Sequence, residues 1–313
     1  MRQEDSARFR EAVERLSGRQ ADAQFGIAVS GGPDSMALLW LALNAFPGRV
    51  MAATVDHGLR PEAADEAAMV AAFCARHGVP HATLRPARPI TGNIQSQART
   101  ARYALLDQWR MDNGVGWLMT AHHAGDQIET MLMRLNRGAG VGGLAGVRAR
   151  NGQVIRPLLH WTKAELVALL EDAGIGYASD PSNQNAQFDR VAMRQALARA
   201  EWLDAAAAAR SADALADAEA ALLWMTGQLA AARISDDADG WRLDARDVPA
   251  ELRRRLLLRM LRMADPAMAE PRGGAVDIVI ARLDAGEKAS LGDWVLSGGE
   301  AWVLRPAPPR RKL

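Results

Sequence analysis

Short apolar runs alternate with helical patterns over the first two-thirds of the chain. Apolar runs at 25–30, 49–55, 82–84 and 117–121 predict buried strands. Helical patterns between and after these runs predict helices at 34–45, 61–77, 95–113, 125–137 and 162–173. Strands that alternate with helices form parallel sheets covered on both faces, so the pattern predicts an α/β domain.

The composition changes near residue 201, where a second part of the chain begins. Alanine dominates 204–233, which predicts a long helix. The segment 252–263 has the pattern of a basic amphipathic helix, and 293–305 alternates around a Gly-Gly pair, which indicates a hairpin. We therefore predict three parts: a first domain at 1–200, a helical linker at 201–235 and a small α+β domain at 236–313.

Bulk composition narrows the function classes. The chain has 313 residues, which suggests about two domains, and 38 basic against 37 acidic residues leave a formal net charge of +1. Any nucleic-acid binding must therefore come from local patches. A single cysteine, Cys74, excludes a disulfide framework and a cysteine-based zinc site.

The start of the chain is charged and lacks the apolar core of a signal peptide. No apolar run approaches the ~18 residues of a membrane span. We therefore expect a cytoplasmic protein without membrane contact. The sequence leaves the oligomeric state open, a homodimer included.

A candidate phosphate loop lies between the first predicted strand and the first predicted helix, in the segment Ser30-Gly31-Gly32-Pro33-Asp34-Ser35. The glycines let the backbone approach an anion, and N–H groups of the loop and of the helix N-terminus point at it. The two serines add hydroxyl donors. A carboxylate beside phosphates needs a cation between them, so Asp34 points to Mg²⁺. A tight turn in which Asp34 and Ser35 only cap the helix is the alternative.

Two rival nucleotide motifs are not supported. The chain contains no Gly-x-x-x-x-Gly-Lys-Ser/Thr string, which excludes a Walker-type loop. The segment 138–143 matches G-x-G-x-x-G, but it follows a predicted helix, whereas a dinucleotide fingerprint follows a strand. We interpret it as part of a glycine-rich loop at 138–146.

Further polar residues follow the predicted strands. His57 comes directly after the second strand, where open α/β sheets bind ligands, although a loop histidine satisfied by backbone is the alternative. Arg99 and Arg102 lie three positions apart on one helix face. Two guanidinium groups suit a triphosphate or a pyrophosphate leaving group, and a solvated basic face is the other interpretation.

A second polar set follows the fourth predicted strand. His122, Asp126 and Glu129 are spaced four and three residues apart, so a helix would place them on one stripe. A metal site, a solvated stripe and a pocket for a cationic substrate all fit this pattern. The two carboxylates would bind an ammonium group well.

Several strings in order resemble one family of enzymes that split ATP into an adenylated product and pyrophosphate. They are the loop at 30–35, VDHGLR at 55–60, NIQSQARTARY at 93–103, HHAGDQIET at 122–130, RPLL at 156–159 and DPSN at 180–183. Together they resemble the bacterial tRNA(Ile)-lysidine synthetases, which belong to the N-type ATP pyrophosphatases, or PP-loop proteins. The resemblance is dense over 24–200. The short second part resembles the compact members, which have one small domain after the catalytic one.

The resemblance implies a parallel five-stranded sheet of the adenine nucleotide alpha hydrolase type, in a catalytic domain at 1–200. It also implies a reaction. The wobble cytidine of a tRNA(Ile) with a CAU anticodon is adenylated at its C2 oxygen, which releases pyrophosphate. The ε-amine of free lysine then attacks C2 and expels AMP, which gives lysidine.

The family roles carry over to matching positions. ATP would contact Ser30, Gly31, Gly32, Pro33, Asp34, Ser35, His57, Arg102 and His122, of which Asp34, Arg102 and His122 would be catalytic and Asp34 would hold Mg²⁺. Free lysine would contact Asp126, Glu129 and Arg194. In the stretch Arg190–Arg194 the family usually has Arg-Asn-Arg, and Val191 and Ala192 depart from this pattern.

A tRNA substrate requires basic patches, and the second part supplies them. Five arginines lie between Arg253 and Arg262, and a basic tail ends the chain. We expect tRNA contacts from Arg253, Arg254, Arg310 and Arg311, with a solubilising helix face as the alternative. The tryptophans of this part, Trp241, Trp294 and Trp302, are expected in its core.

Two other functions remain open from the sequence. One is a tRNA sulfur transferase of the same ATP-splitting class, but such enzymes carry catalytic cysteines. Cys74 lies in a predicted helix among apolar neighbours, where a buried small hydrophobe is expected. The other is a nucleotide-binding regulatory module of the same fold, which the carboxylate stripe and the basic second part argue against.

Overall fold

Two units organise the chain, and one long helix belongs to both. The computed structural model describes residues 2–308 apart from 21, 59–61, 88–93, 179–188, 198, 201, 270 and 272. Contacts between residues divide the chain into Met1–Ala216 and Asp217–Leu313. The division falls inside α9 (Ala205–Arg233), the alanine-rich helix, and therefore inside the segment predicted as a linker.

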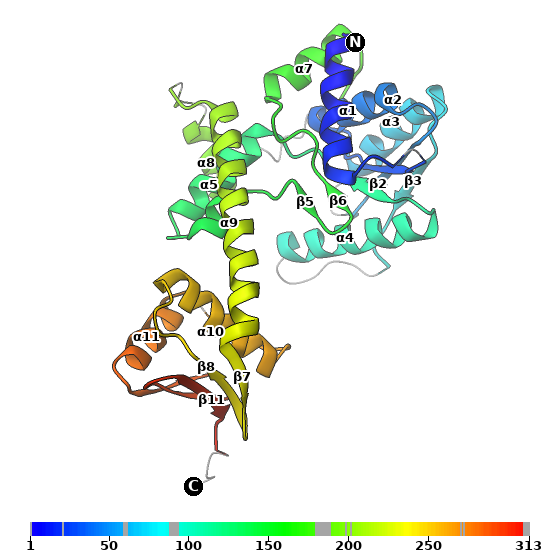
Figure 1. Cartoon of the computed structure of the whole chain (residues 1–313). Coiled ribbons are helices and arrows are strands. Elements are labelled where there is room, and N and C mark those ends of the chain that lie inside the picture. Colours follow the sequence, from blue (N-terminus) through cyan, green and yellow to red (C-terminus); the bar gives the residue numbers. More distant parts are fainter. Residues whose placement is uncertain are drawn as a thin grey trace. The chain divides into compact units, whose positions relative to one another are not determined.

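A mixed sheet forms the centre of the first unit, in the strand order β3-β2-β1-β4-β6-β5 (Figure 1). Five strands are parallel, as predicted, and the two-residue β5 adds an antiparallel edge that the sequence pattern did not predict. The strands are β1 (Phe25–Ala28), β2 (Val50–Val55), β3 (His81–Leu84), β4 (Trp117–Met119), β5 (Arg150–Asn151) and β6 (Val154–Ile155).

Helices cover both faces of this sheet. Successive residues of β1 therefore pack into different hydrophobic cores. Ile27 packs in the larger core with residues of α1, α2, α3 and α7. The next residue, Ala28, packs in a smaller core with Leu106 and Trp109 of α4. A side chain on Gly26 would meet the Trp109 ring at 2.7 Å, so the glycine lets this indole lie directly on β1.

The five predicted helices of this unit agree closely with the observed ones, and three more, at 3–17, 141–144 and 189–197, were not predicted. The helix α1 was not predicted, yet Phe9 and Val13 lie one turn apart and are fully buried against the rest of the unit. The helices of this unit before α9 are α1 (Gln3–Ser17), α2 (Pro33–Ala45), α3 (Glu62–Arg76), α4 (Ile94–Asp112), α5 (Ala124–Leu135), α6 (Val141–Leu144), α7 (Lys163–Asp172) and α8 (Asp189–Leu197).

The glycine-rich segment after α5 is held by side chains of α5. It contains the one-turn helix α6, and Arg134 donates hydrogen bonds to the carbonyls of Gly143 and Gly146. The buried amide of Gln127 bonds both the N–H and the carbonyl of Val147, at 2.6 and 3.0 Å. This segment is therefore fixed to α5 through its backbone.

The second unit has an antiparallel sheet in the order β7-β8-β11-β10-β9, which confirms the predicted α+β domain and its hairpin. Trp302 is buried in its core, and Trp241 and Trp294 pack against that core, as predicted. Its elements after α9 are β7 (Ile234–Asp237), β8 (Gly240–Leu243), α10 (Ala250–Ala264), α11 (Gly273–Asp284), β9 (Lys288–Leu291), β10 (Trp294–Ser297) and β11 (Trp302–Pro306).

The glycine-rich segment offers a matched test of its attachment to α5. Gly146 has φ of 63°, and a side chain there would meet the Gln127 amide oxygen at 2.3 Å. Gly138 has φ of 69° but open space around it. In urea unfolding, we expect Gly138→Ala to cost only the left-handed backbone strain of about 1–2 kcal/mol. Gly146→Ala should cost about 2–5 kcal/mol, because it also breaks the Gln127 hydrogen bonds. Equal losses would show that Gln127 does not hold the segment.

Candidate active site

The segment predicted as a phosphate loop connects β1 to α2. Gly31 has φ of 86°, a left-handed conformation that favours glycine. Gly32 is the N-cap residue of α2, Pro33 is its first residue, and no side chain caps the helix. Its first N–H groups are therefore available to a ligand.

The two loop serines have different roles. The Ser35 hydroxyl is buried; it accepts a hydrogen bond from the Ser30 N–H at 3.1 Å and donates one to the Gly32 carbonyl at 3.0 Å. Ser35 therefore closes the loop with its own hydroxyl. Ser30 is exposed, so its hydroxyl stays at the surface of the loop.

Asp34 is the charged group of this loop. Its Oδ2 lies 3.6 Å from Nε2 of His123, while its Oδ1 is buried and has no hydrogen-bond partner. Burial raises the pKa of Asp34, but the His123 hydrogen bond and the charges of His123, Lys163 and Arg194 outweigh it and hold the pKa below its usual value. Asp34 is therefore a carboxylate with one oxygen left for a cation.

His123 connects this loop to α5, and the sequence analysis did not single it out. It is the N-cap residue of α5: its Nδ1 accepts from the Gly125 N–H at 3.0 Å, and its own N–H donates to Asp126 at 2.9 Å. The ring proton is therefore on Nε2, between Asp34 and Asp126. Burial lowers the pKa of His123, but the two carboxylates raise it above the usual value. The spacing His-x-x-Asp before a helix was the signal for this cap.

His122 lies outside α5, which begins at Ala124. The prediction that it shares a helical stripe with Asp126 and Glu129 is therefore wrong. Its Nδ1 lies 3.1 Å from the Thr120 hydroxyl. Burial, opposed by Asp126 but reinforced by nearby arginines, lowers the pKa of His122 to about 4, so the imidazole is neutral near pH 7.

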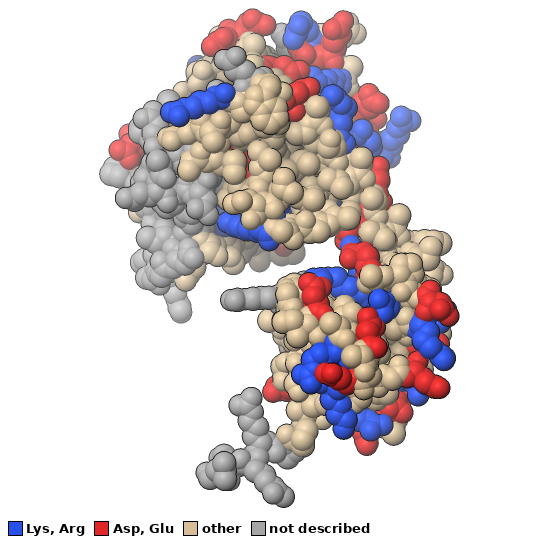
Figure 2. Space-filling model, turned by 90° about the vertical axis from the view of Figure 1, so that its left-hand side faces the viewer, with Lys and Arg blue, Asp and Glu red and all other residues tan. Residues whose placement is uncertain are grey.

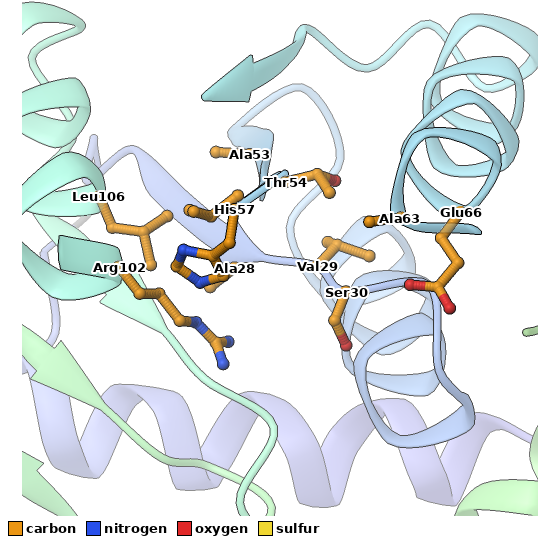
Figure 3. Close-up of a pocket in the computed structure, with 11 residues that line it drawn as sticks. Ala28, Val29, Ser30, Ala53, Thr54, His57, Ala63, Glu66, Arg102 and Leu106 are labelled. Carbon is orange, nitrogen blue, oxygen red and sulfur yellow. The ribbon is translucent and has the colours of Figure 1, made fainter. Parts of the chain in front are cut away.

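A cavity of about 190 Å³ opens at the carboxyl ends of β1 and β2 (Figure 3). His57 and Arg102 lie side by side on one flank, and Ser30 and Glu66 lie on the other. The Nδ1 atom of His57 is buried without a partner, and burial and the Arg102 charge lower its pKa. The remaining lining residues are Ala28, Val29, Ala53, Thr54, Val55, Ala63 and Leu106. The wall thus combines apolar residues with nearly as many polar or charged ones, a mixed lining of the kind that small-molecule sites use to fix a ligand.

The structure brings the three predicted lysine contacts together. Glu129 is buried on α5, and its carboxylate accepts a hydrogen bond from Nε of Arg194 on α8 at 2.5 Å. Nη2 of Arg194 also lies 3.6 Å from Asp126. Burial lowers the pKa of Arg194, but the Glu129 hydrogen bond and the two carboxylates raise it above its usual value. One guanidinium thus neutralises part of a carboxylate pair.

The arginines predicted to contact tRNA have partners within their own unit. Arg253 pairs with Asp284 at 2.6 Å, and Arg254 pairs with Asp277. Arg255 binds Glu219 through both terminal nitrogens. The face of the second unit in Figure 2 accordingly shows acidic side chains among the basic ones. Arg310 and Arg311 lie outside the described residues.

Comparison with known proteins gives the family. A family model described as a PP-loop domain matches residues 2–201. A tRNA(Ile)-lysidine synthase of Zymomonas mobilis is 43% identical over 314 residues, covering 97% of this chain and 94% of the relative. The chain belongs to the tRNA(Ile)-lysidine synthase family.

One more member of this family and one solved structure are also similar to the chain. A tRNA(Ile)-lysidine synthase of Novosphingobium aromaticivorans is also 43% identical, over 91% of this chain and 89% of that one. A U34-tRNA thiolase of Methanococcus maripaludis superposes with a TM-score of 0.55 at 16% identity, over 67% of this chain and 79% of the thiolase. The latter likeness shows the fold alone and agrees with the predicted α/β class.

Two further observations bear on the alternatives that the sequence left open. Cys74 is buried, and burial raises the pKa of its thiol to about 11. This member of the tRNA(Ile)-lysidine synthase family therefore has no activated thiol at position 74. In the part of the chain that the structure describes, no group of three or more histidine, cysteine or acidic side chains could hold a metal ion. No described helix is long and apolar enough to cross a membrane.

The environment of His122 predicts a pH effect on folding in this member of the lysidine synthase family. Its folded pKa of about 4 lies below the unfolded value of about 6.5. The unfolded chain therefore binds the proton more readily, and stability is lost as the pH falls below about 6.5. We expect His122→Asn to lose less unfolding free energy than the wild type between pH 7 and pH 5, measured by urea unfolding. The exposed His77→Asn variant is the control, and equal losses in all three proteins would contradict this assignment.

Proposed function

We propose that this protein ligates free lysine to C2 of the wobble cytidine of tRNA(Ile) with a CAU anticodon, through an adenylated tRNA intermediate. One observation carries the proposal. The anion-shaped loop and the carboxylate pair are joined through a single imidazole, because His123 lies 3.6 Å from Asp34 and 3.8 Å from Asp126. A nucleotide site and a site for a cationic substrate therefore share one edge of the sheet.

ATP would bind across the loop and the neighbouring cavity. The free N–H groups at the start of α2 suit its terminal phosphates, and the cavity beside His57 and Arg102 suits its nucleoside. Arg102 has no carboxylate partner among the described residues, so its charge is available to phosphate oxygens.

The carboxylate of Asp34 suits a magnesium ion. Its buried, unpartnered Oδ1 is an oxygen ligand of the kind that Mg²⁺ takes beside phosphates, usually with only one or two protein carboxylates. When bound, the ion neutralises charge that develops on the departing pyrophosphate. Asp34 itself would hold the ion, and His123 would keep the second carboxylate oxygen in place.

Lysine would bind at Asp126 and Glu129. Its ammonium groups match the two carboxylates, and its own carboxylate matches the guanidinium of Arg194. The buried position of Glu129 excludes water from one side of this site, which strengthens such a contact.

The chemistry requires no covalent enzyme nucleophile. The C2 oxygen of cytidine attacks the α-phosphorus of ATP, and the bond from that phosphorus to pyrophosphate breaks. The deprotonated ε-amine of lysine then attacks C2, the C2–oxygen bond breaks, and AMP leaves with the bonding electrons; the amine proton passes to solvent. The C2 oxygen becomes a good leaving group only as a phosphate ester, which explains the need for ATP.

The second unit would contact the tRNA backbone through its arginines. Arg253 and Arg254 must exchange their partners Asp284 and Asp277 for phosphates, which lowers the gain from each contact. The tail at 309–313 remains the predicted source of further phosphate contacts.

The proposed reaction is tested with the full chain, ATP, lysine and a tRNA(Ile) transcript with a CAU anticodon. We expect pyrophosphate release and lysidine, detected by mass spectrometry of the nucleosides. Asp34→Asn should abolish both while the protein stays folded, because it removes the charge that holds the cation. The exposed Asp172→Asn is the control. Absence of lysidine with the wild type would reject the proposed function.

The lysine site predicts a selective kinetic defect. Glu129→Gln removes a charge-assisted contact of about 1.5–3 kcal/mol, so the KM for lysine should rise roughly tenfold to a hundredfold. The KM for ATP should stay nearly unchanged, because Glu129 lies outside the loop and the cavity. Steady-state kinetics of Glu129→Gln and of the exposed Glu171→Gln give the comparison. An equal rise in both KM values would place Glu129 in the fold or in the nucleotide site.

A further inference from the structure

Arg156 is a buried arginine with almost no partners. Its exposed fraction is 6%, yet its side chain makes one hydrogen bond within the described residues, from Nη1 to the carbonyl of Arg148 at 2.7 Å. Its Nε is buried without an acceptor, and no carboxylate of a described residue pairs with it. A guanidinium has five N–H donors, so most of its hydrogen-bonding capacity is unused.

Arg156 lies at the edge of the sheet that carries the candidate active site. It directly follows β6, which pairs in parallel with β4. The N–H of Thr120 donates to the carbonyl of Ile155, so Arg156 lies beside the residues that follow β4. Thr120 in turn contacts His122.

Three arginines act on His122 from different elements. Arg99 and Arg102 come from α4, and Arg156 comes from the end of β6; the positive charge of each opposes protonation of the imidazole. Arg102 also lines the nucleoside cavity. His122 is therefore within electrostatic reach of both a cavity-lining arginine and the buried Arg156.

A buried charge without a counter-charge is costly, and the cost falls when an anion binds beside it. Burial also makes such a charge a strong and preorganised anion ligand. Arg102 shares this lack of a carboxylate partner among the described residues, whereas other arginines of the unit are paired. Arg110, for example, is paired with Asp107 and donates to the Val115 carbonyl.

We propose that Arg156 is an additional anion-binding residue of the nucleotide site, which with Arg102 receives the phosphate nearest the nucleoside, the one retained in AMP. This assignment rests on the proposed use of ATP. The terminal phosphates are already provided for by the loop before α2, and the nucleoside by the cavity. The phosphate between them would then fall to Arg102 and Arg156, two arginines without carboxylate partners among the described residues whose charges both reach His122.

The test compares AMP with adenosine, which differ only in that phosphate. Their dissociation constants are measured by calorimetry for the wild type, Arg156→Met and Arg156→Lys. In the wild type AMP should bind more tightly than adenosine. In Arg156→Met this advantage should fall at least about tenfold, with adenosine affinity unchanged. Arg156→Lys keeps the charge and should retain part of the advantage. Arg110→Met is the control for loss of a largely buried guanidinium and should keep all of it.

A folded Arg156→Met protein with the wild-type advantage of AMP would overturn the proposal and leave Arg156 a structural residue. If Arg156→Met does not fold, NMR of the wild type decides: AMP should shift the buried Arg156 Nε–H resonance and adenosine should not. No shift with AMP would then overturn it. The outcome is separate from the proposed function, because lysidine formation by the wild type is measured independently of the AMP and adenosine affinities.

Discussion

The imidazole of His123 lies between two carboxylates from different elements, and the site depends on this arrangement. One ring nitrogen caps α5, so the other must carry the proton that faces Asp34 and Asp126. The helix cap thus determines the tautomer, and the tautomer determines how Asp34 is held. One oxygen of Asp34 faces the imidazole in this way, and the other is buried without a hydrogen-bond partner among the described residues.

Arginines are paired differently in the two units, although the chain as a whole is nearly neutral. In the second unit, arginines of α10 pair with acidic residues of α9 and α11 and hold these helices together. At the edge of the first sheet, Arg102 and Arg156 have no carboxylate partners among the described residues. Arginines that are already paired have less to gain from an anion, whereas a preorganised arginine without a carboxylate partner can bind one more strongly.

The sequence predicted most of the fold, because apolar runs and helix signals are local. It did not predict the edge strand β5, which has two residues, or the helices α6, α8 and α11. It also missed α1, whose two buried apolar residues stand in a charged segment. The site was harder to predict for a physical reason. The spacing of His122 was interpreted as helical, but the helix starts two residues later, and the neighbouring histidine forms the cap. Nor does a pattern along the chain indicate that Arg156 lacks a partner, since ion pairs join residues that are distant in sequence.

The guanidinium of Arg194 already occupies the two carboxylates of α5 before any substrate is bound. Binding of a cation there is therefore an exchange of partners and not a simple gain of contacts. A plain diamine would displace Arg194 and leave its charge without compensation. An amino acid with a basic side chain brings a carboxylate that Arg194 can accept in return, so the electrical balance of the site is restored. The site would then select an amino acid over a polyamine because only the amino acid supplies a carboxylate for the displaced Arg194. This selectivity needs no contact that depends on the length of the ligand.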